Sequence, residues 1–443
     1  MPHHRRKVGV VEHLERRRAR VAARWNLTDE IVLIRAGEPV PIEGSDQYHR
    51  FWPHPDHRYL ADQAVPGGVL AFDAAQRSWQ MFTPRLTADE LVWEQAPPPV
   101  GRPLDDLAEW LGSRSGRTVV EAGSGAGTGA GAGQSDPSSP ARVASARVAL
   151  AIAEVRIHKD EAELDALRRA AAMSAAGYAW VFESVAAGMT EREIQIGMEA
   201  EFFRAGAAQV AYDSIVAGGP NGAVLHFMPT GRVVGAGELL LIDAGAQCEG
   251  YASDVTRTMV VGAEPTEAQR FVWEVVLRTH EVAVDRCRAG VEWREVHHQA
   301  ARTIGAGLVE MGLLRGEVDE LVQLGTVALF FPHGLGHLIG LTVHDAGGYG
   351  VGRERSSHPQ FRYLRTDRPL EPGMITSVEP GVYFIDALLQ DPARRAEHGD
   401  RVDWAMVDAL QGFGGVRIED DIHITDGDPE NLTEAIPKPL RIG

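Results

Sequence analysis

Four acidic residues stand at the ends of, or inside, apolar runs that have the pattern of buried β-strands. Asp243 ends the run GELLLID, Asp254 lies in YASDVTRT, Glu379 closes MITSVE, and Glu419 lies in GGVRIEDD. A single acidic residue at a strand end is ordinary, because its charge can reach water. Four in such positions would bury bare charge, which is expensive unless each carboxylate is paired or bound to a metal. The fold must therefore give these carboxylates partners.

The spacing of the first two acidic residues predicts how they meet. Eleven residues separate Asp243 from Asp254, with Gly245 and Gly250 between them. This spacing predicts two adjacent antiparallel strands joined by a turn. Such a hairpin would bring the two carboxylates together.

Histidines supply further candidate ligands in the same half of the chain. The segment PHGLGH contains His333 and His337, VHD contains His344, and His226 stands in GPNGAVLHF. Imidazoles and carboxylates without cysteine form a ligand set that suits manganese, cobalt, zinc or iron. Four or five such ligands exceed the need of one small cation. We therefore expect two ions about 3.5–4 Å apart, with a bridging hydroxide as the nucleophile.

The chain resembles the proline-peptidase branch of the pita-bread metallopeptidases, peptidase family M24. The resemblance is carried by DAG with GYASDVTRT, then PHGLGHLIGLTVHD, SVEPGVYF and GGVRIEDDI, and it covers about residues 157–435. It implies an α+β protein. A pita-bread catalytic domain would occupy residues 157–443, and a smaller α/β domain would occupy residues 1–156.

The resemblance also implies a set of five metal ligands. In the order and spacing of the family, these are Asp243, Asp254, His337, Glu379 and Glu419. Asp254 and Glu419 would bridge both ions, Asp243 would complete the site of one ion, and His337 with Glu379 would complete the other. The expected cofactors are two divalent metal ions per chain. Manganese is expected first, with zinc or cobalt as alternatives.

Other residues of the family's active site correspond to His226, His333 and His344. They would hydrogen-bond the substrate, stabilise the tetrahedral intermediate or shuttle protons, and the alternative for each is a buried structural histidine. Arg417 stands two residues before Glu419, so both side chains point to one face of a strand. Arg417 would orient the bridging carboxylate or contact the substrate, and the alternative is a salt bridge alone.

Two activities of this branch compete for the chain. Prolidases cleave free Xaa-Pro dipeptides, and the stretch FRYLRTDRPLEPGMITSVEPGVYFIDALL resembles theirs. In prolidases, an arginine at the position of Arg365 pairs with the C-terminal carboxylate of the dipeptide. A guanidinium suits that role because it donates two parallel hydrogen bonds to a carboxylate. The alternative for Arg365 is an ordinary surface arginine.

Xaa-Pro aminopeptidases, which remove the first residue of longer peptides, are the second candidate. The segment VPGGVLAFDAAQRSWQMFTPR and the tail NLTEAIPKP resemble theirs. We predict a dipeptidase that uses the bridging hydroxide, with an aminopeptidase as the alternative. A binding protein without catalysis is less favoured, because such a protein would be expected to lack metal ligands.

Composition excludes other classes of function. The chain carries 62 acidic and 44 basic residues, a formal net charge of −18, which argues against nucleic acid or an anionic membrane as a partner. No run approaches the roughly 18 apolar residues of a membrane span. Two cysteines, Cys248 and Cys287, fit a reducing compartment, so we expect a cytoplasmic protein. The expected partners are peptides with proline at the second position and, from the resemblance, further copies of this chain in a homodimer or larger assembly.

The first half of the chain predicts an α/β domain without a chemical motif. Strands are expected at 31–37, 67–73 and 78–84, and helices at the N-terminus and from Pro103 to residue 112. The Gly- and Ser-rich segment 123–140 predicts a flexible loop with no strand leading into it. His49, His54 and His57 lie in one polar loop and are expected at the surface rather than on a metal.

Long helices and strand runs alternate in the second half. Helices are expected at residues 160–182, from Thr190 to Gly206 and from Thr266 to near Gly290. The last two begin with capping boxes, Thr190 with Glu193 and Thr266 with Gln269. Each of the runs YASDVTRTMVVG and GGVRIEDDIHIT predicts one continuous strand.

Overall fold

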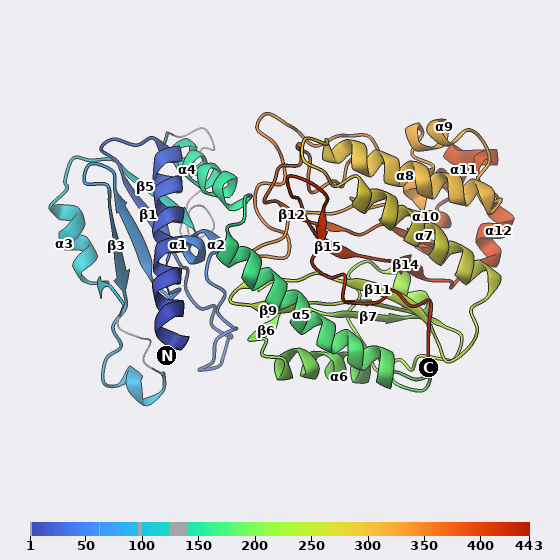
Figure 1. The fold of residues 1–443 in the computed structure, drawn as a ribbon, viewed down its shortest axis with the longest axis horizontal. Helices are drawn as coiled ribbons and strands as arrows, with labels where there is room; N and C mark the ends of the chain where they lie inside the picture. Colours follow the sequence, from blue (N-terminus) through green and yellow to red (C-terminus); the bar gives the residue numbers. More distant parts are fainter. Residues whose placement is uncertain (1, 62, 96–99, 124–139) are drawn as a thin grey trace. The chain divides into compact units, whose positions relative to one another are not determined.

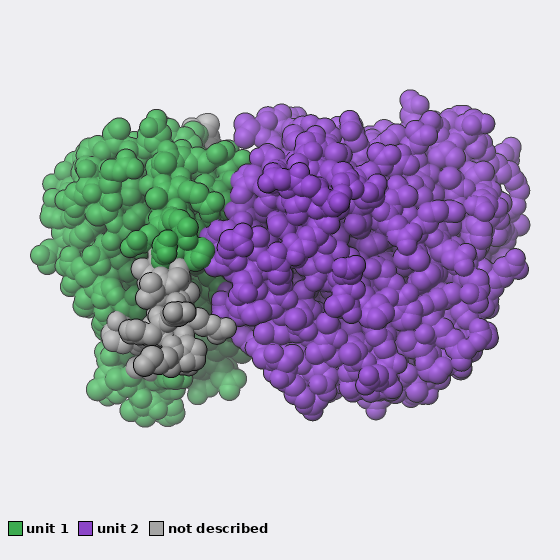
Figure 2. Space-filling view, in the orientation of Figure 1, with its two compact units in different colours: residues 1–156 green, residues 157–443 purple. Residues whose placement is uncertain are grey.

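A computed structural model describes residues 2–61, 63–95, 100–123 and 140–443. The chain forms two compact units, residues 1–156 (unit 1) and 157–443 (unit 2), which are coloured separately in Figure 2. Most of the Gly- and Ser-rich segment, residues 124–139, lies outside the described residues, so the loop expected there stays a prediction.

The described part of unit 1 contains one mixed β-sheet with the strand order β4-β3-β2-β1-β5 (Figure 1). Strand β1 pairs antiparallel with β2 and parallel with β5. It reads IVLIR, and such a continuous apolar run is typical of a strand covered on both faces. The strands are β1 (Ile31–Arg35), β2 (Val69–Asp73), β3 (Ser78–Thr83), β4 (Arg102–Pro103) and β5 (Val119–Gly123).

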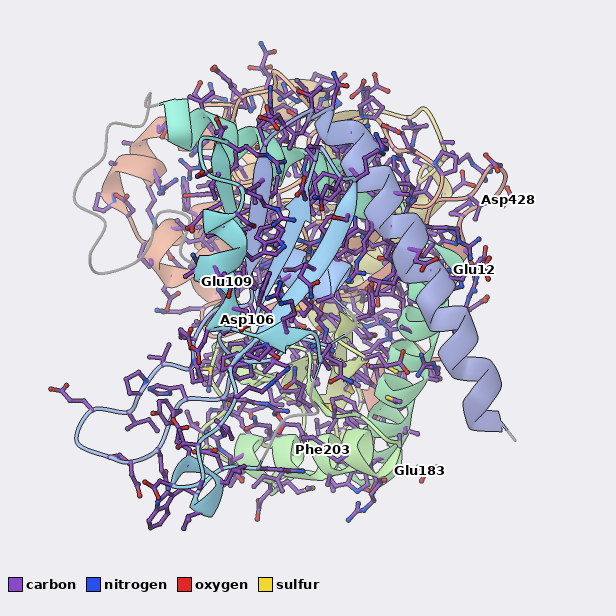
Figure 3. The ribbon with its side chains drawn as sticks, turned by 90° about the vertical axis from the view of Figure 1, so that its left-hand side faces the viewer. Glu12, Asp106, Glu109, Glu183, Phe203 and Asp428 are labelled. Carbon is purple, nitrogen blue, oxygen red and sulfur yellow. The ribbon has the colours of Figure 1, made fainter. Side chains whose placement is uncertain are left out.

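Helices pack around this sheet. Trp25, at the end of the first helix, is buried, and its indole N–H donates to the carbonyl oxygen of Val148 at 3.0 Å. Figure 3 labels Glu12 on the exposed side of that helix. The helices are α1 (Pro2–Trp25), α2 (Pro55–Leu60), α3 (Asp106–Gly112) and α4 (Pro140–Arg156), with a 3₁₀ turn η1 (Glu90–Val92).

Three expectations for unit 1 are wrong. The helix expected from Pro103 begins at Asp106, because Pro103 pairs with Thr83 as part of β4. A strand, β5, does lead into the Gly-rich segment and ends at Gly123. His57 is buried rather than exposed, because it lies on α2, which packs against β1, β2 and β5.

Unit 2 contains four small sheets, with the strand orders β17-β11-β8-β7, β10-β9-β6, β12-β15-β16 and β13-β14. Its first eight strands are β6 (Gln209–Val210), β7 (Ile215–Gly218), β8 (Leu239–Asp243), β9 (Ala246–Cys248), β10 (Tyr251–Ala252), β11 (Thr256–Val261), β12 (Ile375–Val378) and β13 (Gly381–Tyr383). The last four are β14 (Gly415–Arg417), β15 (Asp420–His423), β16 (Glu430–Asn431) and β17 (Arg441–Ile442).

The predicted helices of unit 2 are confirmed, including both capping boxes. Thr190 and Thr266 each accept a hydrogen bond from the backbone N–H three residues later, and Glu193 and Gln269 bond back to the cap. The helices are α5 (Glu161–Ser184), α6 (Glu191–Arg204), α7 (Glu267–Asp285), α8 (Trp293–Glu310), α9 (Val318–Gln323), α10 (Asp386–Leu389), α11 (Pro392–His398) and α12 (Trp404–Ala409). Short 3₁₀ turns are η2 (Gly219–Ala223), η3 (Val327–Leu329) and η4 (Gly399–Arg401).

Two runs predicted as single strands are broken, and each break falls at a predicted metal ligand. YASDVTRTMVVG forms β10 and β11, which pair with different sheets and leave Asp254 between them. GGVRIEDDIHIT likewise forms β14 and β15, with Ile418 and Glu419 at the switch. The predicted antiparallel pairing is present, because β8, which ends at Asp243, pairs with β11, which begins after Asp254. The connection between them is not a single turn, because the small hairpin β9–β10 lies there.

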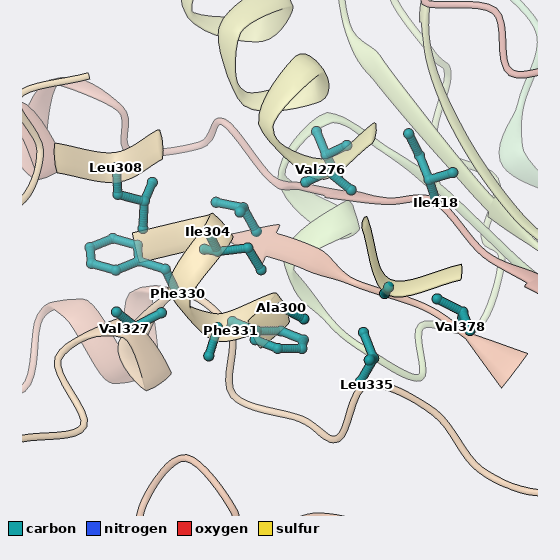
Figure 4. Close-up of a cluster of buried hydrophobic side chains, with 14 of the residues drawn as sticks. Val276, Ala300, Ile304, Leu308, Val327, Phe330, Phe331, Leu335, Val378 and Ile418 are labelled. Atoms are coloured by element: carbon teal, nitrogen blue, oxygen red, sulfur yellow. The ribbon is translucent and has the colours of Figure 1, made fainter. Parts of the chain in front are cut away.

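A large apolar core anchors these switches. Figure 4 shows Val276 of α7 and Ile304 of α8 packed in one cluster with Val378 and Ile418. Val378 and Ile418 immediately precede Glu379 and Glu419, so the core fixes the points at which both carboxylates leave their strands. Rigid elements of this kind position site residues better than loops do.

Candidate metal centre

Pairing of β8 with β11, and of β11 with the segment between β14 and β15, brings Asp243 and Glu419 close together. Strand β8 pairs antiparallel with β11, and Asp243 stands opposite Thr256. On the other side of Thr256, its hydroxyl donates to Oε2 of Glu419 at 2.5 Å, and the backbone N–H of Glu419 donates to the Thr256 carbonyl oxygen at 3.1 Å. The carboxylates of Asp243 and Glu419 therefore lie on opposite sides of Thr256.

Asp254, His337 and Glu419 form the closest cluster of ligand atoms. One ligand atom from each lies within 4.8 Å of the others, and all three residues are buried. Nε2 of His337 is 3.3 Å from Oδ2 of Asp254 and 3.6 Å from Oε1 of Glu379. Four of the five predicted metal ligands thus lie in one group, in which Glu379 is half-buried and the other three are buried.

The segment PHGLGH is held against β12 by backbone contacts. The N–H of His337 donates to Oγ of Ser377 at 3.0 Å, and the N–H of Ser377 donates to the His337 carbonyl oxygen at 2.9 Å. A Cβ atom at Gly336 would lie 2.0 Å from the carbonyl oxygen of Ser377. Glycine at this position lets the imidazole ligand approach the strand that precedes Glu379.

Asp243, the fifth predicted ligand, is held by two hydrogen-bond donors. The Tyr212 hydroxyl donates to its Oδ1 at 2.6 Å, and Nη2 of Arg417 donates to its Oδ2 at 2.6 Å. Arg417 also donates to the Tyr383 hydroxyl at 2.8 Å and to Oγ1 of Thr256 at 3.1 Å. Arg417 therefore orients a carboxylate, but the one it contacts is Asp243.

Burial shifts the protonation of these carboxyl groups. It raises the pKa of Asp243 despite the charge of Arg417, raises the pKa of Glu379 to about 7, and raises the pKa of Glu419 well above its usual value. Burial acts in the same direction on Asp254, but the hydrogen bond and charge of His337 outweigh it and lower the pKa. The raised pKa values of Asp243, Glu379 and Glu419 show that the protein's own positive charges do not fully compensate these carboxylates.

Divalent cations fit this donor set. The groups are carboxylate oxygens and one imidazole, with no thiolate, which is the chemistry preferred by manganese and accepted by zinc or cobalt. Bound cations would supply the positive charge that the buried acids lack.

The other predicted histidines surround the cluster. Nδ1 of His333 donates to the Gly334 carbonyl oxygen at 2.8 Å, which leaves Nε2 to accept from the Tyr383 hydroxyl at 2.9 Å. The ring of His344 stands perpendicular to that of His337, with centroids 4.3 Å apart. Burial, followed by the charges of His337 and Arg365, lowers the pKa of His344 to about 3. His226 is exposed.

All ten predicted site residues line one cavity of about 1210 Å³ in unit 2. The cavity contains the five ligand candidates, His226, His333, His344, Arg365 and Arg417. The sequence analysis missed Tyr212, Thr256 and Tyr383. The last two lie inside the motifs TRT and GVYF, whereas no sequence signal identifies Tyr212.

Comparison with known proteins identifies the family. The family model described as metallopeptidase family M24 matches residues 165–426. The chain belongs to metallopeptidase family M24. This M24 chain is 32% identical to human Xaa-Pro dipeptidase, over 90% of this chain and 87% of the relative. It is 30% identical to a probable Xaa-Pro aminopeptidase, pepP, of Botryotinia fuckeliana, over 97% and 95% of the two chains.

A solved structure supports the fold assignment of this M24 chain. Aminopeptidase PepP of Pseudomonas aeruginosa superposes with a TM-score of 0.79 at 30% identity, covering 97% of this chain and 96% of that one. The predicted α+β class and pita-bread fold are confirmed. Within the described residues, no helix is both long and apolar enough to cross a membrane.

His297 supports the ligand segment of this M24 chain, and the sequence analysis did not single it out. Its Nδ1 accepts from the Leu335 N–H at 3.1 Å, and its Nε2 donates to the Gln360 carbonyl oxygen at 2.7 Å. Nδ1 can accept only in the neutral ring, and burial lowers the pKa of His297 to about 4. His297 therefore links α8 to the PHGLGH segment.

Proposed function

We propose that the chain is a metal-dependent Xaa-Pro dipeptidase whose active site is the cavity that contains Asp254, His337 and Glu419. The observation that carries the proposal is the convergence of ten residues, chosen from sequence alone, on that one cavity. Both groups of named relatives, the dipeptidases and the aminopeptidases, act at Xaa-Pro, which supports the substrate class.

The proposed metal ligands are Asp243, Asp254, His337, Glu379 and Glu419. They would hold two divalent ions, of which manganese is the expected one. When bound, such ions polarise a carbonyl and lower the pKa of a bound water. The protein's part is to hold the ligands. Thr256 orients Glu419 through its hydroxyl, and Arg417 and Tyr212 orient Asp243.

The remaining side chains would act on the substrate. His344 and His226 face the cavity, are not proposed as metal ligands, and can accept or donate protons at the reacting peptide bond. The chain of hydrogen bonds from Arg417 through the Tyr383 hydroxyl to His333 fixes the tautomer of His333, whose Nδ1 keeps its proton. That network would keep the wall beside Glu379 rigid.

Arg365 is the proposed determinant of dipeptide specificity. Its side chain is exposed in the cavity, close enough to His344 for its charge to lower that residue's pKa. Among the described residues, its guanidinium makes no hydrogen bond or ion pair. A free dipeptide carries a carboxylate directly after the proline ring, and that carboxylate would pair with this guanidinium.

An Xaa-Pro aminopeptidase is the second candidate because of the size of the cavity. Its volume of about 1210 Å³ lies above the ~300–1,000 Å³ typical of small-molecule sites. It extends to α11, where Asp391, Arg394 and Glu397 line it. A longer peptide could occupy that extension.

Arg365→Ala tests the proposal directly. Losing one partner of a desolvated charge pair costs about 2–5 kcal/mol, or roughly 30- to several-thousand-fold in kcat/KM for Xaa-Pro dipeptides. The kcat/KM for Xaa-Pro-Xaa tripeptides should be nearly unchanged. Arg355→Ala is the matched control, because Arg355 lines the same cavity from the same loop. A wild type that prefers tripeptides, or equal losses on both substrates, would favour the aminopeptidase.

We also propose that the two units are separate domains and that the chain assembles as a cytoplasmic homodimer or larger homo-oligomer. Exposed aromatic residues in unit 1, Trp52 at 52% and Trp93 at 82%, are candidates for such an interface. Light scattering of the purified chain tests the assembly, and a monomer would contradict it.

A further inference from the structure

The position of the Arg365 guanidinium depends on the backbone segment that carries it. Its exposed side chain makes no hydrogen bond or ion pair among the described residues, so no neighbouring side chain holds the guanidinium in place. A charged group placed for a substrate carboxylate must be held within about 0.5 Å of its working position. What holds the segment around Arg365 therefore bears on specificity, and the inference drawn from it rests on the proposed role of Arg365.

A neighbouring segment lies directly against the backbone of Arg365. The N–H of Asp367 donates to the Gly348 carbonyl oxygen at 2.7 Å, and the N–H of Gly350 donates to the Asp367 carbonyl oxygen at 3.0 Å. A Cβ atom at Gly348 would lie 2.1 Å from the carbonyl oxygen of Arg365. The Tyr349 hydroxyl donates to the Leu364 carbonyl oxygen at 3.0 Å. The two segments form one paired unit.

The side chain of Asp367 ties this unit to α8. Asp367 is 1% exposed, and its Oδ1 accepts from Nη1 of Arg353 at 2.9 Å, while its Oδ2 pairs with Arg294. Arg353 also binds both carboxylate oxygens of Glu292, at 2.8 and 3.0 Å. Glu292 occupies the N-cap position of α8, and Arg294 lies in the first turn of that helix, next to the fully buried Trp293. The core thus anchors the carboxylate of Asp367.

Asp367 and Arg365 face different cavities. Arg365 lines the catalytic cavity, whereas Asp367, Arg353 and Arg294 line a second cavity of about 820 Å³. Asp367 is 1% exposed and lines the second cavity rather than the catalytic one, so we expect it to make no direct contact with a substrate. Any effect it has on substrate choice must pass through the segment that carries Arg365.

We propose that Asp367 is a positioning residue for Arg365: its buried carboxylate, held by Arg353 and Arg294, fixes the backbone from which the guanidinium reaches the carboxylate of a dipeptide. Asp367 lies two residues after Arg365, and its own backbone N–H donates to the Gly348 carbonyl oxygen. Loss of the anchor would let the segment shift while leaving the metal ligands in place.

A double-mutant cycle tests this role with Xaa-Pro dipeptides and Xaa-Pro-Xaa tripeptides. Asp367→Asn should raise KM for dipeptides by about 10- to 100-fold, the range expected for a displacement near 1 Å, and leave tripeptides within about twofold. In an Arg365→Ala background, Asp367→Asn should have almost no further effect, because both changes remove the same interaction. If Asp367 had a merely structural role, Asp367→Asn would lower kcat/KM for both substrates in either background.

Two further variants keep the test decisive. Arg353→Leu weakens the same anchor from a more exposed residue, for use if Asp367→Asn fails to fold, and it should raise KM for dipeptides in the same way. Asp73→Asn is the matched control, because Asp73 is a fully buried carboxylate held by Arg114 and Arg117 in unit 1. It should leave the dipeptide-to-tripeptide ratio unchanged.

The outcomes separate this inference from the proposed function. If Arg365→Ala lowers dipeptide turnover but Asp367→Asn and Arg353→Leu do not, Asp367 does not position Arg365. If Arg365→Ala itself leaves the ratio unchanged, the dipeptidase proposal fails first. Additive losses in the double variant would also overturn the inference.

Discussion

His344 lies beside the ligand candidates without belonging to them. Its ring stands 4.3 Å from that of His337, centroid to centroid, and it lines the catalytic cavity. Arg417 and Tyr383 hold different neighbours, Asp243 and His333, by direct hydrogen bonds. At the scale of single residues, the site therefore divides into groups that would bind metal, groups that hold those ligands, and histidines that would contact a substrate.

Replacing His344 with alanine separates catalysis from metal binding. Loss of a proton-transfer or oxyanion-stabilising group typically lowers kcat by ~10²-fold or more. The metal content of the purified variant, measured by elemental analysis, should equal that of the wild type. A variant that loses both activity and metal would make His344 a ligand instead.

At the scale of elements, the ligands stand where strands change sheets. Asp254 separates β10 from β11, and Glu419 separates β14 from β15. At each break, a carboxylate stands beside apolar residues that pack into the core. The same chain regions read as continuous strands in the sequence, because alternation and β-propensity do not report which partner strand each half will pair with.

Gly336 illustrates how closely the elements approach at the site. In Gly336→Ala the new Cβ would meet the Ser377 carbonyl oxygen at 2.0 Å, so the His337 segment must move away from β12. We expect a loss of about 1–3 kcal/mol in stability and weaker metal binding. Gly231→Ala, where no atom lies within 4 Å of the new Cβ, is the control in thermal unfolding and metal titration. Equal behaviour of the two variants would contradict the close approach.

The chemistry was easier to predict than the architecture that assembles it. Asp243, Asp254, Glu379 and Glu419 were recognisable because carboxylates rarely occupy apolar runs without partners, whereas the family resemblance selected His337 as a ligand. Tyr212 and His297 were not, since their hydrogen bonds to Asp243 and Leu335 join positions 31 and 38 residues apart in sequence. Long-range pairing decides such roles. The role of the exposed Arg365 was predictable only through resemblance.

At the scale of the whole molecule, unit 1 contributes no predicted site residue but carries its own pH sensitivity. His57 is fully buried, and neither ring nitrogen has a hydrogen-bond partner among the described residues. Burial, with the charges of His54 and Arg18, lowers its pKa to about 4. Since the unfolded chain binds this proton near pH 6.5, stability should fall as the pH drops from about 6.5 towards 4.

His57→Leu should remove that part of the acid sensitivity. From pH 7 to pH 5, the shift in pKa corresponds to about 2 kcal/mol of lost stability for the wild type. The variant should lose less over the same range in urea unfolding, and it should be at least as stable as the wild type at pH 5. Parallel losses in both proteins would show that His57 is not buried as a neutral ring.

The central claim is that buried carboxylates from several strands hold two divalent ions on which activity depends. Elemental analysis of metal-reconstituted wild type, Asp254→Asn and Glu419→Gln, each paired with an Xaa-Pro dipeptide assay, tests it most directly. We expect about two manganese ions per chain in the wild type. We also expect a lower metal content and no measurable turnover in both variants, as in the chelated wild type. Full activity in either variant, or one ion per chain in a fully active wild type, would contradict the claim.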